Sequence, residues 1–433
     1  MLLAAASCRQ ADLPRPALTE APTHERYAAA LAEFGLDQTA LGQDWLRAAD
    51  AALAGPLATG LPFRESGYLA PEAPTAIGYQ FELRRGRRLV IDVTLETAEP
   101  TRLFIDLFEM TEDGEPRRVA STAPDERHLD YEARRDAVHV LRVQPELLRG
   151  GRFTITQRSL ASLGFPVEGL STHAILSVFG DPRDAGRRNH HGVDIFAPRG
   201  TPVLAAVDGR VRVGTNDRGG NVIWLSPTSG TRRRFYYAHL HDWAVENGSH
   251  VRAGEVVGYV GNTGNARTTL PHLHFGVYDR GPVDPYPYLG VDDAQPPAAA
   301  GTLDLIRRWV RIVERDAPLH ESPSSGAGIR ARLARGDVAR VLAASGAFYR
   351  VELPDGAMGY VAVRQVTEAG QPLASTALAV ATALRDRPQA RAAVIDTLSP
   401  ASTVDVLGRF GDFRLVRLAD ARTGWLLVNG DAQ

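Results

Sequence analysis

The chain has 433 residues, which is too long for a single hydrophobic core, so two to four domains are expected. Hydrophobic residues make up 44% of the chain and charged residues 23%, which is typical of an ordinary globular protein. The formal net charge of −2 excludes a strong general attraction to nucleic acid or to acidic membrane surfaces.

The single cysteine, Cys8, excludes an intrachain disulfide framework and any metal site built from several cysteines. It follows a short apolar run and precedes a segment rich in Pro, Ala and Thr, so residues 1–25 are expected to be a signal remnant and a tether. Ala5-Ala6-Ser7-Cys8 resembles a bacterial lipobox, which implies lipidation of Cys8 and a membrane-anchored, periplasmic protein. Seven preceding residues are too few for a whole signal peptide, so a chance coincidence is the alternative. No other stretch approaches the ~18 apolar residues of a transmembrane helix.

Residues 26–158 are expected to form an accessory domain that is helical at first and β-rich afterwards. Apolar residues recur at helical spacing in its first part, at Tyr27, Leu31, Phe34, Leu41, Trp45 and Leu46. From about Leu61 the period changes to two, which predicts strands at Tyr79–Leu83, Leu89–Leu95, Leu103–Leu107, Val138–Val143 and Phe153–Ile155. Regularly spaced, half-buried strands favour a small β-sandwich that serves for packing or positioning.

The most informative segment covers residues 159–292, in which seven of the twelve histidines fall within 85 residues. Neutral imidazole and carboxylate are the ligands that catalytic zinc prefers, with one coordination position left to water. Further histidines beside such a metal would transfer protons or stabilise an oxyanion. The sequence therefore predicts a zinc hydrolase, whose candidate residues lie in the segments His190-His191-Gly192-Val193-Asp194, Tyr237-Ala238-His239-Leu240 and Pro271-His272-Leu273-His274-Phe275.

The spacing of these residues indicates how they are arranged. Gly192 and Val193 between His190 and Asp194 favour a turn that enters a strand over a helix. His272 and His274 are two apart in an apolar run, so both project from one strand face, ~7 Å apart. That separation is too long for both to bind one ion at ~2.1 Å. One of the two is expected on the metal, with the other beside the attacking water, and the spacing does not say which.

The rest of the chain contains a linker and a repeat. Residues 293–315 are expected to be a linker followed by a helix over Leu303–Val313. Beyond them, apolar and glycine positions recur with an offset of 65, as in Gly359-Tyr360-Val361 and Gly424-Trp425-Leu426. The two copies, 316–368 and 372–433, are similar to tandem bacterial Src-homology-3-like modules, small β-barrels that flank cell-wall enzymes or serve as spacers. The predicted fold class is therefore mainly β and multidomain.

Several motifs of the histidine-rich segment, taken together, resemble the LytM/lysostaphin-type zinc endopeptidases of peptidoglycan, also called murein hydrolases or DD-endopeptidases. They occur in family order over about residues 170–290: His190-x-Gly192-x-Asp194, Gly200-Thr201-Pro202-Val203, Gly219-Gly220-Asn221-Val222-Ile223, Tyr237-Ala238-His239-Leu240, Gly258-Tyr259-Val260-Gly261-Asn262-Thr263-Gly264 and His272-Leu273-His274-Phe275. Two features depart from the family pattern. Gly276 stands where the family often has an acidic residue, and the loop Asn265–Pro271 is altered. Both bear on substrate preference.

The resemblance implies one zinc ion per chain, held by His190, Asp194 and His274, with His239 and His272 as the catalytic pair. One of the pair would take a proton from the attacking water, and the pair would then stabilise the oxyanion or return a proton to the leaving amine. Which histidine is the base is left open. The remaining histidines nearby, His173, His191, His241 and His250, are expected to be bystanders, with His191 pointing away from the metal and His241 at the rim of the groove.

The function implied by the resemblance is hydrolysis of peptide bonds in peptidoglycan, with peptidoglycan as the partner. Two other functions are compatible with the same motifs: a non-catalytic scaffold that activates a cell-wall amidase, and a zinc peptidase for proteins outside the wall. The arginines Arg187, Arg188 and Arg232-Arg233-Arg234 either meet carboxylates of the stem peptide or are solvated loop charges. Autoinhibition by the accessory domain or the repeats, and the oligomeric state, are left open.

Overall fold

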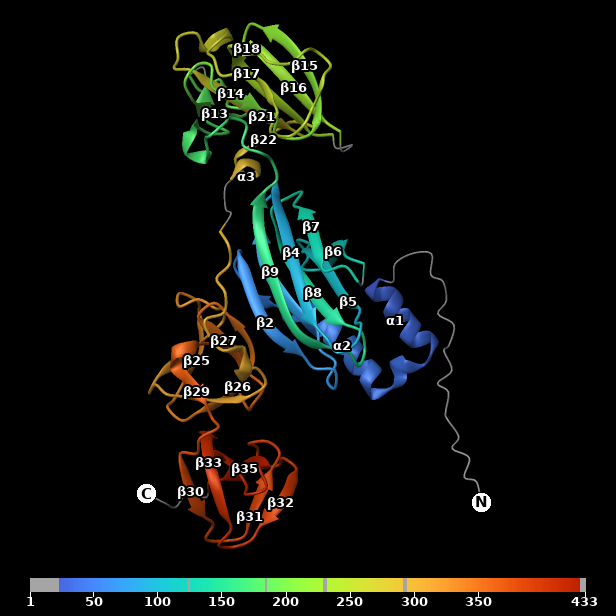
Figure 1. Cartoon of the computed structure of the whole chain (residues 1–433), viewed down its shortest axis with the longest axis vertical. Helices are drawn as coiled ribbons and strands as arrows, with labels where there is room; N and C mark the ends of the chain where they lie inside the picture. Colours follow the sequence, from blue (N-terminus) through green and yellow to red (C-terminus); the bar gives the residue numbers. More distant parts are fainter. Residues whose placement is uncertain (1–22, 124, 184, 229–231, 291–293, 429–433) are drawn as a thin grey trace, which may run out of the picture.

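The structure is a computed structural model that describes residues 23–123, 125–183, 185–228, 232–290 and 294–428. Cys8 and its lipobox lie outside these residues. As the sequence predicts, the fold is mainly β and has several domains. A central domain occupies one end of the molecule, a β-sandwich the middle and two small modules the other end (Figure 1). None of the described helices is long and apolar enough to cross a bilayer.

The accessory domain is a β-sandwich that carries two helices, as expected. The helices α1 (His24–Glu33) and α2 (Ala40–Ala54) pack through Trp45, which is 1% exposed and whose indole donates to the carbonyl of Pro145 at 2.8 Å. One sheet has the order β1-β3-β8-β5-β6 and the facing strands have the order β2-β9-β4-β7. These strands are β1 (Leu57–Ala58), β2 (Phe63–Leu69), β3 (Ile77–Leu83), β4 (Arg87–Glu96), β5 (Leu103–Met110), β6 (Pro116–Ser121), β7 (His128–Glu132), β8 (Ala137–Pro145) and β9 (Gly151–Ala161).

Alternation of side chains explains the sandwich. In β9 every second residue from Gly151 to Gln157 is buried, and in β4 the buried residues include Leu89, Ile91 and Val93. These inward residues meet those of the other sheet, such as Ile105 and Leu107 of β5, in one apolar core.

The central domain is built on an antiparallel sheet with the order β10-β13-β21-β17-β16-β15-β19, with β22 paired to β21. A small sheet, β14-β20-β18, covers one face of it, and both share one apolar core. The elements are β10 (Ile175–Ser177), β11 (Pro182–Arg183), β12 (Arg188–Asn189), β13 (Val193–Phe196), β14 (Pro202–Leu204), β15 (Gly209–Asn216), β16 (Gly220–Pro227), β17 (Arg234–Leu240), β18 (Asp242–Trp243), β19 (His250–Val251), β20 (Val256–Tyr259), β21 (His272–Tyr278), β22 (Pro282–Val283) and α3 (Tyr286–Leu289).

The two C-terminal modules confirm the repeat, because the bounds of six strands recur 65 residues further along the chain. The first module contains β23 (Trp309–Ile312), β24 (Ala317–His320), β25 (Ile329–Leu333), β26 (Val338–Ser345), β27 (Phe348–Glu352), β28 (Met358–Ala362) and β29 (Val366–Glu368). The second contains β30 (Ala374–Ala377), β31 (Thr382–Arg385), β32 (Val394–Leu398), β33 (Thr403–Phe410), β34 (Phe413–Arg417) and β35 (Thr423–Leu427).

Two expectations for this region are corrected by the structure. The helix expected over Leu303–Val313 is wrong: only a 3-10 turn, Leu303–Leu305, forms, and β23 follows it. Val310 and Ile312 point into the core of the first module while β23 pairs with β26 and β29, so the extended backbone buries them. The modules also differ from the expected small barrels, because the pairings between their described strands leave open sheets.

A buried ion pair joins the first module to the β-sandwich. β26 pairs with β2, so the sheet of the sandwich continues into the module. At this junction Glu65, which is fully buried, accepts two bonds from the guanidinium of Arg350 at 3.0 and 3.1 Å. Tyr79 also donates to Glu65 at 2.7 Å, and Tyr360 does so at 3.5 Å. Burial, followed by the nearby Glu65 charge, raises the pKa of both tyrosines, so they stay neutral donors.

We predict that Arg350→Met destabilises this unit by about 3–5 kcal/mol, because it leaves the Glu65 carboxylate buried without its cation. Urea denaturation of the full chain measures the change. The double variant E65L/R350M removes both charges and should recover most of the loss. R332M is the control, because the Arg332–Asp316 pair is exposed and should change the stability by less than about 1 kcal/mol. An R350M variant as stable as R332M would contradict the role of the buried pair.

Candidate metal centre

The register of two strands places the predicted site residues on one face of the sheet. β13 and β21 are antiparallel, with Asp194 opposite His274 and Phe196 opposite His272. Between them Ile195 and Leu273 face the opposite side of the sheet, where both are fully buried. Because side chains alternate along a strand, burying this apolar pair turns Asp194 and both histidines to the open face.

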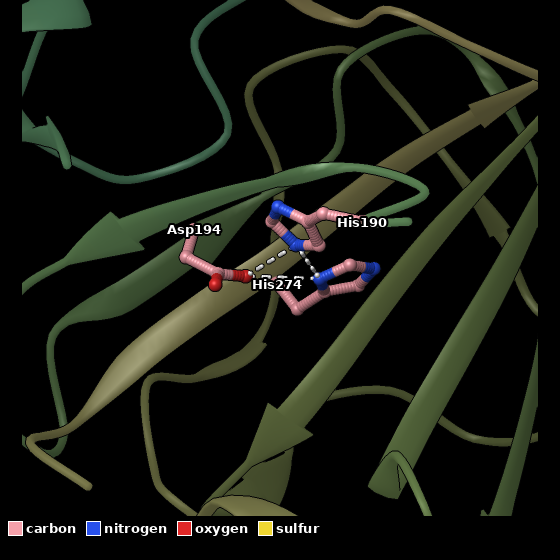
Figure 2. A group of neighbouring side chains, drawn as sticks. All are labelled: His190, Asp194 and His274. Carbon is pink, nitrogen blue, oxygen red and sulfur yellow. Dashed lines mark hydrogen bonds and ion pairs between the residues drawn. The ribbon is translucent and has the colours of Figure 1, made fainter. Parts of the chain in front are cut away.

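His190, Asp194 and His274 bring three ligand atoms together (Figure 2). The distance from His190 Nε2 to His274 Nδ1 is 2.9 Å, and Asp194 Oδ1 lies 3.0 Å from the former and 2.9 Å from the latter. A tetrahedral ion with bonds of about 2.0–2.1 Å holds its ligand atoms roughly 3.3 Å apart, so the three atoms are close to the spacing that zinc needs. The residues that the resemblance names as ligands thus could hold a metal.

The hydrogen bond that His190 makes with the backbone leaves the lone pair of its Nε2 free for a metal ion. His190 Nδ1 lies 2.8 Å from the carbonyl of Val178, which can only accept, so Nδ1 carries the proton and Nε2 presents its lone pair. Burial disfavours the charge of Asp194, but the adjacent imidazoles of His190 and His274 outweigh it and hold the pKa of Asp194 well below its usual range. The donor set is therefore an ionised carboxylate with imidazoles, which suits zinc.

Gly192 is required by the close approach of His274. A Cβ on Gly192 would lie 2.8 Å from both Cε1 and Nε2 of the His274 ring and 2.5 Å from the carbonyl oxygen of Phe275. Any other residue at this position would displace the ring or the β21 backbone. The glycine between His190 and Asp194 therefore has a steric reason within the site itself.

His239 and His272 form a second pair beside the three ligand candidates. Their ring centroids are 5.0 Å apart, and the ring of His239 lies 6.0 Å from that of His274. His239 Nδ1 is 2.9 Å from the carbonyl of Thr263, and His272 Nδ1 is 2.8 Å from that of Leu270. Both carbonyls can only accept, so in each neutral ring Nδ1 carries the proton and Nε2 is free to accept one.

The backbone and the surroundings of His239 are unusual. Its φ is 63°, a left-handed backbone conformation that residues other than glycine rarely adopt and that is often found at functional sites. Burial, and then the neighbouring His272 and His274, lower the pKa of His239 to about 4. The ring is consequently neutral at neutral pH, which is the state that a proton acceptor needs.

These side chains line a groove of about 670 Å³ on the open face of the sheet. Its walls come from the central domain alone, so among the described residues neither the sandwich nor the C-terminal modules cover it. His191, expected to be a bystander that points away, is exposed and lines the groove, because it follows His190 in a loop and not in a strand. His173, His241 and His250 are exposed and do not line it, so the expected place of His241 at the rim of the groove is not confirmed.

Sequence reasoning missed Arg183, which contacts Asp194 of the candidate metal centre. Its guanidinium lies 2.7 Å from Asp194 Oδ2, the oxygen that does not face the two histidines, and it also binds Ser177. Arg183 comes from the hairpin of β11 and β12, and only the folded chain brings that hairpin to β13. A single arginine in a charged loop has no spacing that would have identified it. By binding Oδ2 it leaves Oδ1 turned toward the metal position.

Comparison with known proteins identifies the class of this domain. Residues 188–285 match the family model of peptidase family M23. The glycyl-glycine endopeptidase ALE-1 of Staphylococcus capitis is 47% identical over 89 residues, which cover 20% of this chain and 24% of that protein. The L-Ala–D-Glu endopeptidase of Bacillus subtilis (strain 168) is 38% identical over 144 residues, or 30% of this chain and 44% of that protein. The chain thus spans less than half the length of each of these relatives.

Among solved structures, the catalytic domain of lysostaphin from Staphylococcus simulans is 32% identical, with a TM-score of 0.23; the match covers 30% of this chain and 92% of that chain. The family match and the curated relatives show a peptidase M23 domain with lysostaphin-type relatives in the middle of the chain, as the motifs indicated. The assignment of individual residues to metal binding and to catalysis stays a prediction.

We predict that His190→Ala loses zinc, whereas His272→Ala keeps about one zinc per chain and loses hydrolysis by about 10²–10⁴-fold. The first removes a ligand atom and the second removes a proton acceptor beside it. Metal content by mass spectrometry after dialysis, together with peptide hydrolysis, separates the two effects. Loss of zinc from H272A with retention in H190A would reverse the assignment.

We also predict that Arg183→Gln weakens zinc binding by about 10–100-fold, because the carboxylate of Asp194 then loses the group that orients it. Competition with a chromogenic chelator measures the affinity. Arg218→Gln is the matched control, because Arg218 lines the same groove without contacting a ligand candidate. Equal zinc affinities of R183Q and R218Q would exclude the positioning role.

Proposed function

We propose that the protein is a zinc-dependent metalloendopeptidase that hydrolyses amide bonds in the stem peptides or cross-links of peptidoglycan. The observation that carries this proposal is the convergence of His190, Asp194 and His274 beside two histidines with free Nε2 atoms, inside a groove. A non-catalytic scaffold would need neither the ligand set nor the histidine pair.

The residues around the metal position can each serve a different step of the hydrolysis. Bound zinc would supply a Lewis acid and would make water acidic enough to lose a proton near neutral pH. His239 and His272 each present Nε2 to the groove, so one can accept the proton of the attacking water. Once it is protonated, the same histidine can donate to the oxyanion or return this proton to the leaving amine. The carbonyls of Thr263 and Leu270 fix both rings in the orientation that this requires.

The relatives support peptidoglycan as the substrate, because one of them, from Vibrio cholerae, is named a peptidoglycan DD-endopeptidase. Two others are named a glycyl-glycine endopeptidase and an L-Ala–D-Glu endopeptidase, which differ in the bond cut. The proposal for this chain is accordingly the class of substrate, amide bonds of wall peptides. A periplasmic location with a lipid anchor at Cys8, and wall-binding by the two Src-homology-3-like modules, belong to the same proposal and rest on sequence resemblance.

We expect the zinc-loaded full chain to release soluble muropeptides from intact sacculi, and H272A to release none above background. Mass spectrometry of the released fragments identifies the bond by the new amino and carboxyl termini. Zinc-loaded protein that leaves sacculi intact yet stimulates a cell-wall amidase would show the scaffold function instead. Protein that cleaves a casein substrate but no sacculi would show a peptidase for proteins outside the wall.

A further inference from the structure

Beyond the metal centre, the open face of the central sheet continues as an aromatic floor. Tyr236 of β17 lies next to the metal centre: its ring is edge-on to that of His274, with the ring centroids 6.0 Å apart. The ring of Trp224 of β16 follows at 4.6 Å from Tyr236, and that of Tyr278 of β21 lies 5.1 Å from Trp224. All three rings line the catalytic groove. Trp224 and Tyr278 also line a second hollow of about 630 Å³, so the two cavities adjoin each other.

The second hollow ends in positive charge. Arg234 lies opposite Tyr278 in the strand pairing, Arg280 sits at the tip of the β21–β22 hairpin, and Arg232 precedes β17; all three are exposed and line the hollow. None of them forms an ion pair with another residue in the described part of the chain. The nearby acids are already engaged, since Glu132 pairs with Arg233 and Asp279 pairs with Arg85.

Gly276 explains why the floor can exist. This residue stands between His274 and Tyr278 on the same face of β21, where the family often has an acidic side chain. A Cβ on Gly276 would lie 2.9 Å from Cε2 of Tyr278 and 3.2 Å from the carbonyl oxygen of His191. The Tyr278 ring therefore occupies space that a side chain at position 276 would take. The glycine that departs from the family pattern is therefore what makes room for the aromatic floor.

We propose that this surface is a second arm of the substrate groove, which binds a carboxylate-bearing segment of the peptide. Arg232, Arg234 and Arg280 would bind the carboxylate, and the aromatic floor would contact the apolar part of the same segment. The proposal rests on the proposed function for the nature of the peptide. Guanidinium groups bind carboxylates with short, charge-assisted hydrogen bonds, and aromatic rings offer flat apolar area beside them. Exposed charges of this kind determine which substrates bind well. They do not contact the bond that is hydrolysed.

The test compares two purified muropeptide dimers, one with free carboxylates and one with the same carboxylates converted to carboxamides. Calorimetry with zinc-loaded, full-length H272A gives Kd, and wild-type kinetics give KM and kcat. In the H272A background, R234Q/R280Q should weaken binding of the carboxylate dimer about tenfold and leave the carboxamide dimer unchanged. In the active enzyme, R234Q/R280Q should raise KM for the carboxylate dimer about tenfold and should alter kcat by less than about twofold. R391Q, an exposed arginine of the second C-terminal module, is the control.

The outcomes separate this proposal from the proposed function. Equal weakening of both dimers, or none, overturns the basic arm even where the enzyme cleaves them. Arginine-dependent binding of the carboxylate dimer without cleavage of either dimer supports the arm while it removes the hydrolytic function.

A second variant tests the aromatic floor apart from the charge. Gly276→Ala should displace Tyr278 and weaken binding of both dimers alike, by about three- to tenfold, with zinc content unchanged. Gly214→Ala is the matched control, because a Cβ there meets no atom within 4 Å. Binding by G276A that equals that of G214A overturns the role of the floor.

Discussion

The pairing of β13 with β21 is the constraint on which the candidate site depends. Burial of Ile195 and Leu273 on one face fixes the register, and the register places Asp194 opposite His274 on the other. A slip of one residue would exchange the buried pair for the polar pair and would cost the burial of both apolar side chains. The hydrophobic core thus determines the position of Asp194 and His274, and His190 and Arg183 then complete the candidate centre from neighbouring segments.

The architecture keeps this centre accessible. The groove is formed by the central domain, while the C-terminal modules lie at the far end of the molecule, beyond the sandwich (Figure 1). The buried contact of Arg350 with Glu65 and the continuous sheet from β2 to β26 hold the first module in that place. In the described part of the chain, the accessory domain and the modules therefore act as a support for the catalytic domain, and neither acts as a cover.

Much of this arrangement could be predicted from the sequence because it follows from local periodicity. The period-two strands of the sandwich, the repeat with its offset of 65, and the placement of His272 and His274 on one strand face all appear in the structure. The helix expected over Leu303–Val313 failed because Leu303, Ile306 and Val310 have helical spacing, yet pairing with β26 and β29 buries Val310 in a strand. Arg183 and the Glu65–Arg350 pair could not be predicted, since each joins segments that only tertiary folding brings together.

The central claim is that two imidazoles and one carboxylate of this chain hold a single zinc ion with a position left for water. X-ray absorption at the zinc edge of the loaded full chain tests it most directly. The account predicts four nitrogen or oxygen ligands at about 2.0–2.1 Å, two of them imidazoles, and loss of the zinc in H274A, as in H190A. A spectrum with three or four imidazoles, which would bring His239 or His272 onto the metal, would contradict it.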